Sequence, residues 1–372
     1  MISCKYTSSG KNPSGYASAA RAFITALFVS GVNVTCETIA QMVEQTDYGL
    51  EGKIMNALEN RRIPYKVKLI HLTPDLYPIY TEKGVYTIGH LFWETDKLPK
   101  EWIQPLNQID EIWTASPQMI EMIKASGVTT PCYAFPQPIW TDQASEAIAP
   151  FALPYPKDFT FYSIFQWIDR KNPRSLLRAY WKAFEGNDRV SLLLKTYRIN
   201  YSESEFNLIK RDIEQWKKEL GLNHFPKVFL IRKLLSQSQM AKLHKLGDCY
   251  VTSSSGEGWN RPLQEAMLFG KPTISADNGG LTDIMLKSQY FYVPSIPKNA
   301  TEVSTIPWYT RDMQWKEVDE DKLAEQMLHV HNQHAKTLSV AKKAQDFVIE
   351  NFSFQRVGNL MRQRLEQIYR EI

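Results

Sequence analysis

The chain alternates regularly between short apolar segments rich in β-forming residues and longer segments with helical periodicity. This alternation is typical of successive βαβ units, in which parallel strands build a sheet and helices cover its faces. We expect strands near residues 2–6, 32–36, 67–72, 85–89, 111–115 and 132–135, and then near 159–165, 191–194, 228–231, 249–252, 273–275 and 291–293. The sequence therefore predicts an α/β fold.

Chain length and a proline-rich segment divide this series of strands into two. A chain of 372 residues is long enough for about two domains. Five prolines lie between Pro136 and Pro156, where no periodicity is sustained, as expected of an extended linker. Apolar spacing predicts helix over 322–369, broken near Asn351, with its last part crossing back to the first domain. We expect one domain over 1–150 plus 353–372 and another over 151–352.

The composition argues against several classes of protein. The net charge of +4 is too small to indicate nucleic acid or acidic lipid as a partner. The four cysteines are far apart and form no C-x-x-C pair, which argues against a zinc site or a disulfide framework and fits a reducing compartment. No segment approaches the roughly 18 apolar residues of a membrane span, and the N-terminus lacks a secretory signal. We therefore expect a soluble cytoplasmic protein.

Residues 250–280 carry the strongest chemical signal, because they form the pattern strand, glycine-bearing loop, helix, strand and loop. Small residues at 253–258 supply backbone amides where the loop meets the helix, and Pro262 suits the first helical turn. The unpaired N–H groups and partial positive charge at such a helix start attract phosphate. This segment therefore predicts a phosphate site.

Two carboxylates bracket the start of this helix, Glu257 in the loop and Glu265 in the helix, with seven residues between them. Glu265 can accept hydrogen bonds from two vicinal hydroxyls of a ribose, and Glu257 can reach a ligand that lies over the loop. The alternative is a solvated loop acid and an acid that complements the helix dipole. The spacing alone does not separate these two interpretations.

The segment resembles the E-x7-E donor-binding region of the retaining GT-B enzymes of glycosyltransferase family 4. The matching residues are Glu257, Gly258, Pro262, Glu265, Ala266, Met267, Gly270 and Pro272, followed by the pair Gly279 and Gly280. The resemblance implies two facing Rossmann-like domains, an N-terminal acceptor domain and a C-terminal donor domain, joined again by the returning C-terminal helix. It also implies transfer of a glycosyl group from a UDP- or GDP-sugar to a glycan or other hydroxyl acceptor, with no cofactor and no essential metal.

The same resemblance gives roles to residues of the motif. It implies that Glu257 contacts the donor sugar, that Glu265 binds the ribose, and that the loop holds the diphosphate through Gly258, Trp259, Asn260, Arg261 and Leu263. Asn260 and Arg261 stand where the family commonly has Gly and an apolar residue, and Asp283 stands where it often has Glu. Asn tolerates the left-handed backbone better than most residues, so the loop can keep its shape. Arg261 either adds charge at the diphosphate or faces the acceptor.

A second segment, 161–181, resembles the first strand, loop and helix of the family's donor domain. Lys171 matches the lysine that stabilises the leaving diphosphate, while Gln166 occupies the usual arginine position and Arg170 lies close by as a substitute. An exposed loop at a helix entry is the alternative. Arg232, after the strand at 228–231, is expected to help recognise the nucleotide.

The N-terminal half lacks the sequence fingerprints of dinucleotide-binding folds and P-loops. Gly15, after Ser14, resembles the loop that closes over the donor phosphates, although it also fits a tight turn between strand and helix. His90 and Glu94 follow a strand end, where ligands of open α/β sheets bind. The resemblance implies that His90 hydrogen-bonds the donor sugar or stabilises charge near it; a structural histidine is the alternative.

Two patterns resemble metal sites but do not fit them. His329, His331 and His334 do not converge on one helical face. The acidic run 319–321 matches the D-x-D of metal-dependent transferases, yet it suits an acidic first turn better. Two rival functions stay open, namely a non-catalytic pseudo-glycosyltransferase subunit that binds a sugar nucleotide or a partner, and a phage-type glycosyltransferase that acts on modified DNA.

Overall fold

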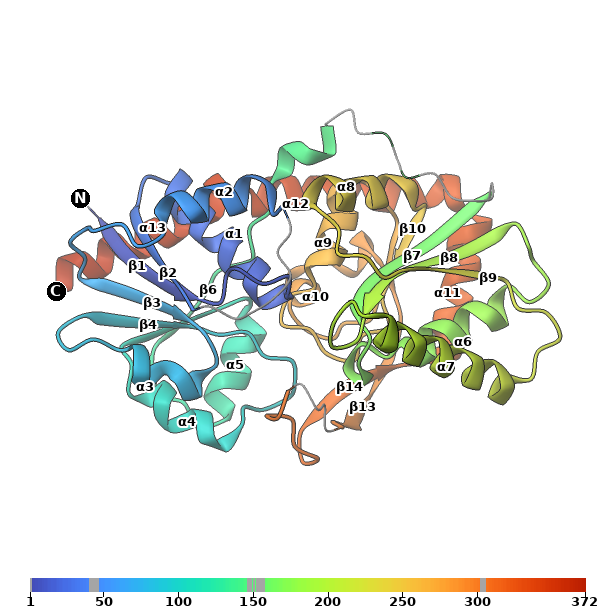
Figure 1. Cartoon of the computed structure of the whole chain (residues 1–372), viewed down its shortest axis with the longest axis horizontal. Coiled ribbons are helices and arrows are strands. Elements are labelled where there is room, and N and C mark those ends of the chain that lie inside the picture. Colours follow the sequence, from blue (N-terminus) through green and yellow to red (C-terminus); the bar gives the residue numbers. More distant parts are fainter. Residues whose placement is uncertain (1, 40–46, 146–148, 150, 152–157, 302–305) are drawn as a thin grey trace. The chain divides into compact units, whose positions relative to one another are not determined.

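A computed structural model describes residues 2–39, 47–145, 149, 151, 158–301 and 306–372 (Figure 1). The chain forms two compact units, Met1–Asp142 with Ile349–Ile372 and Gln143–Val348. The boundaries predicted from the sequence lie at 150/151 and 352/353. Residues 146–148, 150 and 152–156 of the predicted linker between Pro136 and Pro156 lie outside the described residues.

The N-terminal unit is built on a parallel six-stranded sheet in the order β2-β1-β3-β4-β5-β6. Its strands are β1 (Ser3–Ser8), β2 (Asn33–Thr38), β3 (Val67–His71), β4 (Tyr86–His90), β5 (Glu111–Thr114) and β6 (Cys132–Ala134). Its main helices are α1 (Gly15–Val29), α2 (Gly49–Leu58), α3 (Tyr77–Tyr80), α4 (Lys100–Asn107), α5 (Pro117–Ala125) and α13 (Phe354–Glu371). All six strands predicted from the sequence are present.

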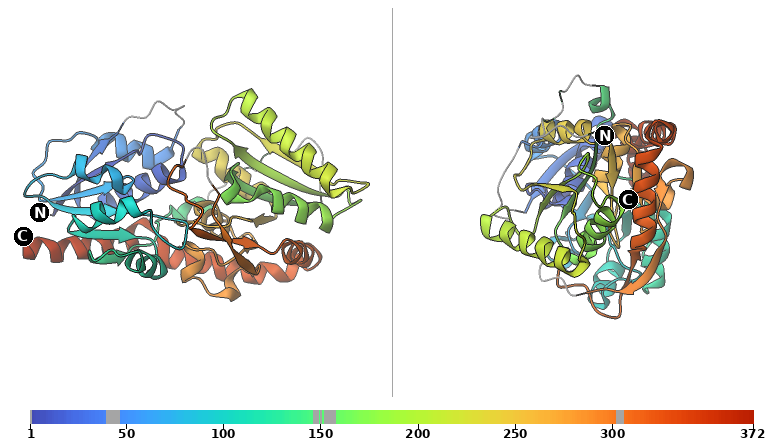
Figure 2. Two further views of the ribbon diagram at one scale, coloured as in Figure 1. Left: turned by 90° about the horizontal axis from the view of Figure 1, so that it is seen from below. Right: turned by 90° about the vertical axis from the view of Figure 1, so that its right-hand side faces the viewer.

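The C-terminal helix α13 packs against α1 and completes the N-terminal unit (Figure 2, left). The two helices touch so closely that a Cβ on Gly358 would lie 2.1 Å from the carbonyl oxygen of Ala26. Arg364 is held by the fully buried carboxylate of Glu111, with Nη2 at 2.7 Å from Oε2. The buried ion pair and the glycine contact fix α13 to this unit.

The C-terminal unit contains a second parallel sheet in the order β12-β11-β10-β7-β8-β9. Its strands are β7 (Phe159–Gln166), β8 (Val190–Tyr197), β9 (Lys227–Ile231), β10 (Cys249–Val251), β11 (Thr273–Ser275) and β12 (Phe291–Tyr292). The helices α6 (Pro173–Ala183), α7 (Glu203–Leu220) and α11 (Glu320–Asn332) contribute apolar side chains to one core with the sheet. Helices α8 (Gln237–Leu246) and α9 (Arg261–Leu268) lie on the other side of the sheet in Figure 1.

The structure differs from the sequence prediction in two places in this unit. The helical segment predicted over 322–369 has the break expected near Asn351, at Ser353 between α12 (His334–Phe352) and α13. It also has a break at Gln333, between α11 and α12, that was not predicted. An antiparallel pair, β13 (Ser295–Asn299) and β14 (Gln314–Val318), was not predicted. Its first strand is almost wholly exposed, so it lacks the apolar alternation that marks a half-buried strand.

No helix in the described ranges is long and apolar enough to cross a membrane.

Candidate functional site

The loops that follow β7 and β10 are joined by hydrogen bonds at the carboxyl end of the C-terminal sheet. The amide of Ser255 donates to the carbonyl of Arg170 at 2.7 Å, and the hydroxyl of Ser253 donates to the carbonyl of Asn172 at 2.7 Å. Because β7 and β10 are parallel neighbours, their loops leave the same edge of the sheet. The small residues after β10 therefore bring the two predicted donor-site segments together.

Glu257 lies between two cations in this loop pair. Lys171 places Nζ 2.6 Å from each carboxylate oxygen, and Arg170 places Nη1 3.6 Å from Oε2. The side chains of Glu257 and Arg170 are almost fully buried, whereas that of Lys171 is 18% exposed. Burial raises the pKa of Glu257, but the charges of Lys171 and Arg170 outweigh it, so the pKa lies below its ordinary value. The carboxylate is therefore held in its ionised form.

Helix α9 begins at Asn260, which adopts the left-handed conformation with φ of 77°. This is the left-handed backbone that Asn tolerates better than most residues. Its side-chain oxygen accepts the amide of Leu263 at 3.3 Å, and Pro262 occupies the first turn. The amide of Leu263, expected at the diphosphate, is thus engaged by the cap. The other end of the cap, Asn260 Nδ2, is buried without a hydrogen-bond partner among the described residues.

The glycine pair after β11 packs directly against the backbone of the Glu257 loop. A Cβ on Gly280 would lie 2.4 Å from the Cα of Trp259, and one on Gly279 would lie 2.8 Å from the carbonyl oxygen of Glu257. Both glycines also have positive φ, at 102° for Gly279 and 58° for Gly280. The amide of Leu281 donates to the carbonyl of Trp259 at 2.9 Å. Only glycine fits here, and the contact fixes the loop that carries Glu257.

Glu265 forms a second polar cluster on α9. Arg261, one turn earlier, donates from Nε to Oε1 at 2.9 Å, and His244 of α8 lies with Nε2 3.2 Å from Oε2. Burial raises the pKa of Glu265, but the hydrogen bond from His244 and the charge of Arg261 bring it below the ordinary value. The Glu265 side chain keeps 19% of its surface exposed, more than that of Glu257.

Two further residues predicted at the donor site are turned toward other partners. Gln166 donates from Nε2 to the carbonyl of Arg198 at 2.8 Å. The guanidinium of Arg232 lies 5.6 Å from the ring centroid of Phe206 and 4.0 Å from the carboxylate of Glu203. Neither residue contacts the Glu257 or Glu265 clusters in the interactions described, and their predicted roles stay predictions.

The predicted residues of the N-terminal unit form a separate group. Ser14 caps α1 by accepting the amide of Ala17 at 3.2 Å, and the position of a Cβ on Gly15, the first residue of α1, is open. His90 is the last residue of β4 and is fully buried, with Nδ1 3.0 Å from the hydroxyl of Tyr6. Burial lowers the pKa of His90 well below its ordinary value, so the ring is neutral. The roles of Gly15 and His90 stay predictions.

The apparent metal motifs have structural contacts of their own. Asp319 caps α11 by accepting the amides of Asp321 and Lys322. His331 and His334 pack edge-on against Phe159. Within the described part of the chain, no group of three His, Cys, Asp or Glu residues is arranged to hold a metal ion.

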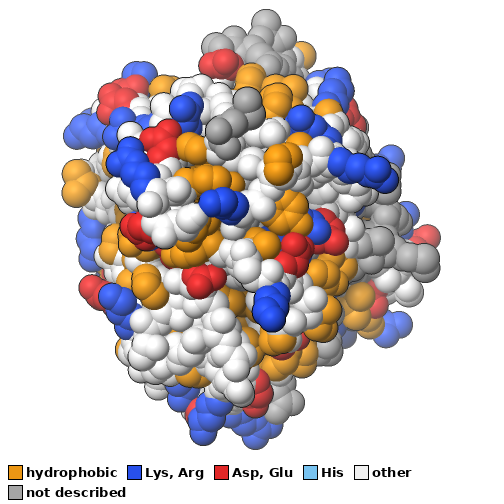
Figure 3. Space-filling model, turned by 90° about the vertical axis from the view of Figure 1, so that its left-hand side faces the viewer, with side chains coloured by type: hydrophobic (Ala, Val, Ile, Leu, Met, Phe, Trp, Pro, Cys, Tyr) orange, Lys and Arg blue, Asp and Glu red, His pale blue; other side chains and the backbone are white. Residues whose placement is uncertain are grey.

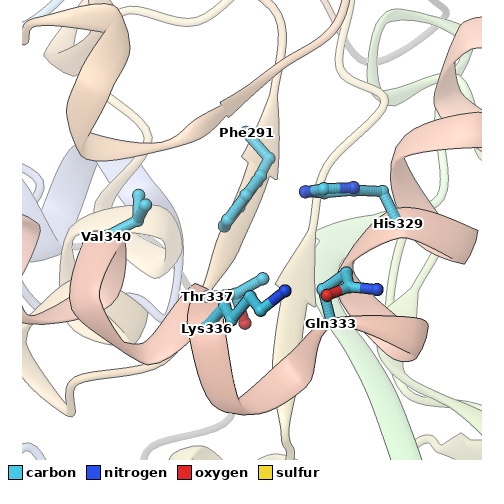
Figure 4. A pocket seen from close by; sticks show the side chains of 6 residues that line it. All are labelled: Phe291, His329, Gln333, Lys336, Thr337 and Val340. Carbon is cyan, nitrogen blue, oxygen red and sulfur yellow. The ribbon is translucent and has the colours of Figure 1, made fainter.

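A hollow of about 550 Å³ lies between the edge strand β12 and the helices α11 and α12 (Figure 4). Its lining residues are Phe291, His329, Gln333, Lys336, Thr337 and Val340. Figure 4 shows the rings of Phe291 and His329 directed toward the hollow. None of the predicted site residues lines it, so it is separate from the polar clusters around α9.

Two buried polar residues of the C-terminal unit were not identified from the sequence. His244 contacts Glu265 from α8, where a single histidine in an amphipathic helix gives no signal. Lys195 ends the apolar stretch of β8 and is 94% buried, with Nζ 3.1 Å from the hydroxyl of Tyr201 and 5.2 Å from the ring centroid of Tyr197. Burial lowers the pKa of Lys195 to about 8. A lysine at the end of an apolar strand was the available signal.

Comparison with known proteins agrees with this arrangement. Residues 158–302 match the family model of the glycosyl transferases group 1, so the segment that holds both carboxylate clusters is similar to these enzymes. No curated protein matches the chain significantly.

Solved structures resemble the whole chain. HepE of Anabaena in complex with UDP and glucose is 13% identical, with a TM-score of 0.69 over 99% of this chain and 100% of that one. Sucrose-phosphate synthase of Thermosynechococcus elongatus is 14% identical, with a TM-score of 0.71 over the full length of both chains. The N-terminal domain of a trehalose-6-phosphate phosphatase of Candida albicans is 12% identical, with a TM-score of 0.65 over 99% and 97%. The two parallel six-stranded sheets and these likenesses confirm the predicted α/β GT-B fold.

Proposed function

We propose that this chain is a retaining glycosyltransferase that moves a hexosyl-type group from a nucleoside-diphosphate sugar to a glycan or other hydroxyl acceptor, without an essential metal. The observation that carries the proposal is the pair of ionised carboxylate clusters, one around Glu257 in the loop before α9 and one around Glu265 within α9. Both lie in the segment that matches the group 1 glycosyl transferases. The proposal also covers the family 4 assignment suggested by the E-x7-E motif.

The donor would lie over the start of α9. Glu265 would accept the two ribose hydroxyls, because a carboxylate can accept from two donors at once. Glu257 would accept from hydroxyls of the donor sugar.

The reaction needs charge stabilisation when the bond between the sugar and the diphosphate breaks. Lys171, Arg170 and Glu257 together carry a net charge of +1, and an oxyanion held beside them would neutralise it. Preorganised charges in a buried site stabilise a leaving group more than they would in water. The acceptor hydroxyl would attack from the face that the leaving diphosphate vacates, and that diphosphate would take the acceptor's proton. The configuration at the anomeric carbon would then be retained.

We further propose UDP as the donor nucleotide in preference to GDP, because solved structures of HepE contain UDP and UDP-glucose.

We also propose that the protein is located in the cytoplasm. The four cysteines are free, and burial raises the pKa of Cys4, Cys36 and Cys249, as suits unreactive thiols in a reducing compartment.

The proposal is tested by turnover of nucleoside-diphosphate sugars in the presence of EDTA. We expect slow hydrolysis of one donor by the unmodified chain, transfer to an added acceptor, and an anomeric configuration in the product that matches the donor by NMR. Glu257→Gln should depress turnover and Glu265→Ala should raise the KM for the donor. Glu219→Gln is the matched control, because Glu219 pairs with Arg174 and Gln215 at the surface of α6 and α7.

Two results would favour the rival functions. Tight nucleotide binding without turnover over a broad acceptor panel would indicate a pseudo-glycosyltransferase. The reason to consider this function is that Gln166, Asn260 and Arg261 depart from the residues common in the family. Strongly salt-dependent DNA binding would indicate a transferase acting on modified DNA. On the face drawn in Figure 3, Lys and Arg side chains lie among acidic and apolar ones and form no continuous basic surface, which speaks against DNA there.

A further inference from the structure

The carboxylate of Glu265 is held by the protein at both of its oxygens. Arg261 Nε lies 2.9 Å from Oε1, and His244 Nε2 lies 3.2 Å from Oε2. His244 is 1% exposed, whereas the Glu265 side chain keeps 19% of its surface exposed. The imidazole therefore stands behind the carboxylate, on its buried side.

The proton on His244 is directed toward Glu265 by a third residue. The hydroxyl of Tyr162, on β7, lies 3.0 Å from His244 Nδ1. Burial raises the pKa of Tyr162 well above its ordinary value, so the hydroxyl stays protonated and donates to Nδ1. With Nδ1 accepting from Tyr162, the imidazole hydrogen that faces Glu265 is the one on Nε2, and it donates to Oε2. Tyr162, His244 and Glu265 form a chain of hydrogen bonds that all run in one direction.

The packing around His244 leaves the imidazole little freedom. Phe269 stacks on the imidazole, with ring centroids 5.3 Å apart and planes 5° from parallel. At the end of α8, a Cβ on Gly247 would lie 2.1 Å from the ring of Tyr162, so the absence of a side chain there lets Tyr162 reach His244. The position of the imidazole is thus set by β7, α8 and the residue that ends α9.

We propose that His244 is a positioning residue that orients Glu265 for the vicinal hydroxyls of a ribonucleotide. Each carboxylate oxygen can accept two hydrogen bonds, and the protein supplies one to each. One acceptor site on each oxygen remains, which matches the 2′- and 3′-hydroxyls of a ribose. The site consequently selects ribonucleoside over 2′-deoxyribonucleoside diphosphates. This inference rests on the proposed function, because it takes Glu265 to be the ribose ligand.

The experiment compares the dissociation constants of UDP and 2′-deoxy-UDP for the unmodified chain and three variants. We expect the unmodified chain to bind UDP at least tenfold more tightly than the deoxy analogue. In His244→Phe, the dissociation constant for UDP should rise about tenfold while that for 2′-deoxy-UDP changes less than twofold, so the preference disappears. His244→Gln keeps an N–H donor at a similar reach and should restore much of the preference.

Tyr162→Phe removes a single oxygen and keeps the aromatic packing, so it carries the test if His244→Phe does not fold. It should lower the preference for UDP without abolishing binding. Equal loss of both ligands in these variants, or an unchanged ratio, would overturn the positioning role while leaving the proposed function intact. If the unmodified chain bound no nucleoside diphosphate, the proposed function itself would fail and this inference with it.

Discussion

The ion pair between Lys171 and Glu257 gives a prediction whose size follows from its geometry. At 2.6 Å and an effective dielectric constant of about 20, the Coulomb attraction is on the order of 6 kcal/mol, before the cost of removing both groups from water. Lys171→Met would leave a buried carboxylate facing only Arg170, whose nearest nitrogen lies 3.6 Å away. Breaking a buried pair by removing one partner costs about 3–5 kcal/mol, and the remaining arginine places our expectation near 3 kcal/mol.

A double-mutant cycle isolates this interaction. Glu257→Gln added to Lys171→Met should cost less than the sum of the two single changes, with a coupling energy of at least about 2 kcal/mol. Arg174→Met is the matched control, because Arg174 pairs with Glu219 at 2.8 Å on the surface, where such pairs contribute about 0–1 kcal/mol.

The assay is equilibrium denaturation followed by hydrogen exchange and mass spectrometry, since peptides from β7 and β10 report on the C-terminal unit alone. If Lys171→Met cost no more than Arg174→Met, the ion pair would not be the buried interaction described here.

Three further predictions concern stability. Gly280→Ala should destabilise the C-terminal unit by more than about 2 kcal/mol, because the new Cβ would meet backbone atoms. Gly186→Ala is the control: Gly186 also has positive φ but lies in open space, so the change should cost about 1 kcal/mol. Equal losses of stability in thermal unfolding would contradict this prediction. Lys195→Met should stabilise the fold by roughly 1–3 kcal/mol at pH 7. Burial lowers the pKa of Lys195 to about 8, so the cost of keeping its charge buried is complete below pH 8 and decreases as the pH rises toward 10.5, the pKa of an exposed lysine. Urea midpoints that differ between the two proteins by the same amount at pH 7 and at pH 10.5 would refute this. Arg364→Ala should lower the free energy of unfolding by about 3–5 kcal/mol, because it leaves the carboxylate of Glu111 buried without its cation. Unchanged resistance of the C-terminal helix to protease would contradict this.

The sequence predicted the fold well because the strands of both sheets are short apolar segments between helices. Every predicted strand is present, with ends that shift by at most a few residues. The β13–β14 pair was missed because its exposed first strand carries Pro297 and Lys298 in place of an alternating apolar pattern. The break at Gln333 was missed because apolar spacing continues on both sides of it.

For the site, the sequence identified residues whose spacing along the chain is informative, but it could not identify contacts between distant segments. The glycine-bearing loop, Asn260 and the two carboxylates are local features of one segment. His244 is 21 residues from Glu265, and its contact depends on how α8 and α9 pack. The hydrogen bond from Gln166 to the carbonyl of Arg198 also depends on tertiary structure, because the long side chain could donate to several different partners.

The central claim, a sugar-nucleotide site at the start of α9, is tested most directly by calorimetric titration of UDP and GDP, in EDTA, into the unmodified chain, Glu265→Ala and Glu219→Gln. We expect one nucleotide to bind the unmodified chain and Glu219→Gln with equal affinity, and to bind Glu265→Ala at least tenfold more weakly. Absence of binding by both nucleotides, or equal affinity in Glu265→Ala, would contradict the central claim.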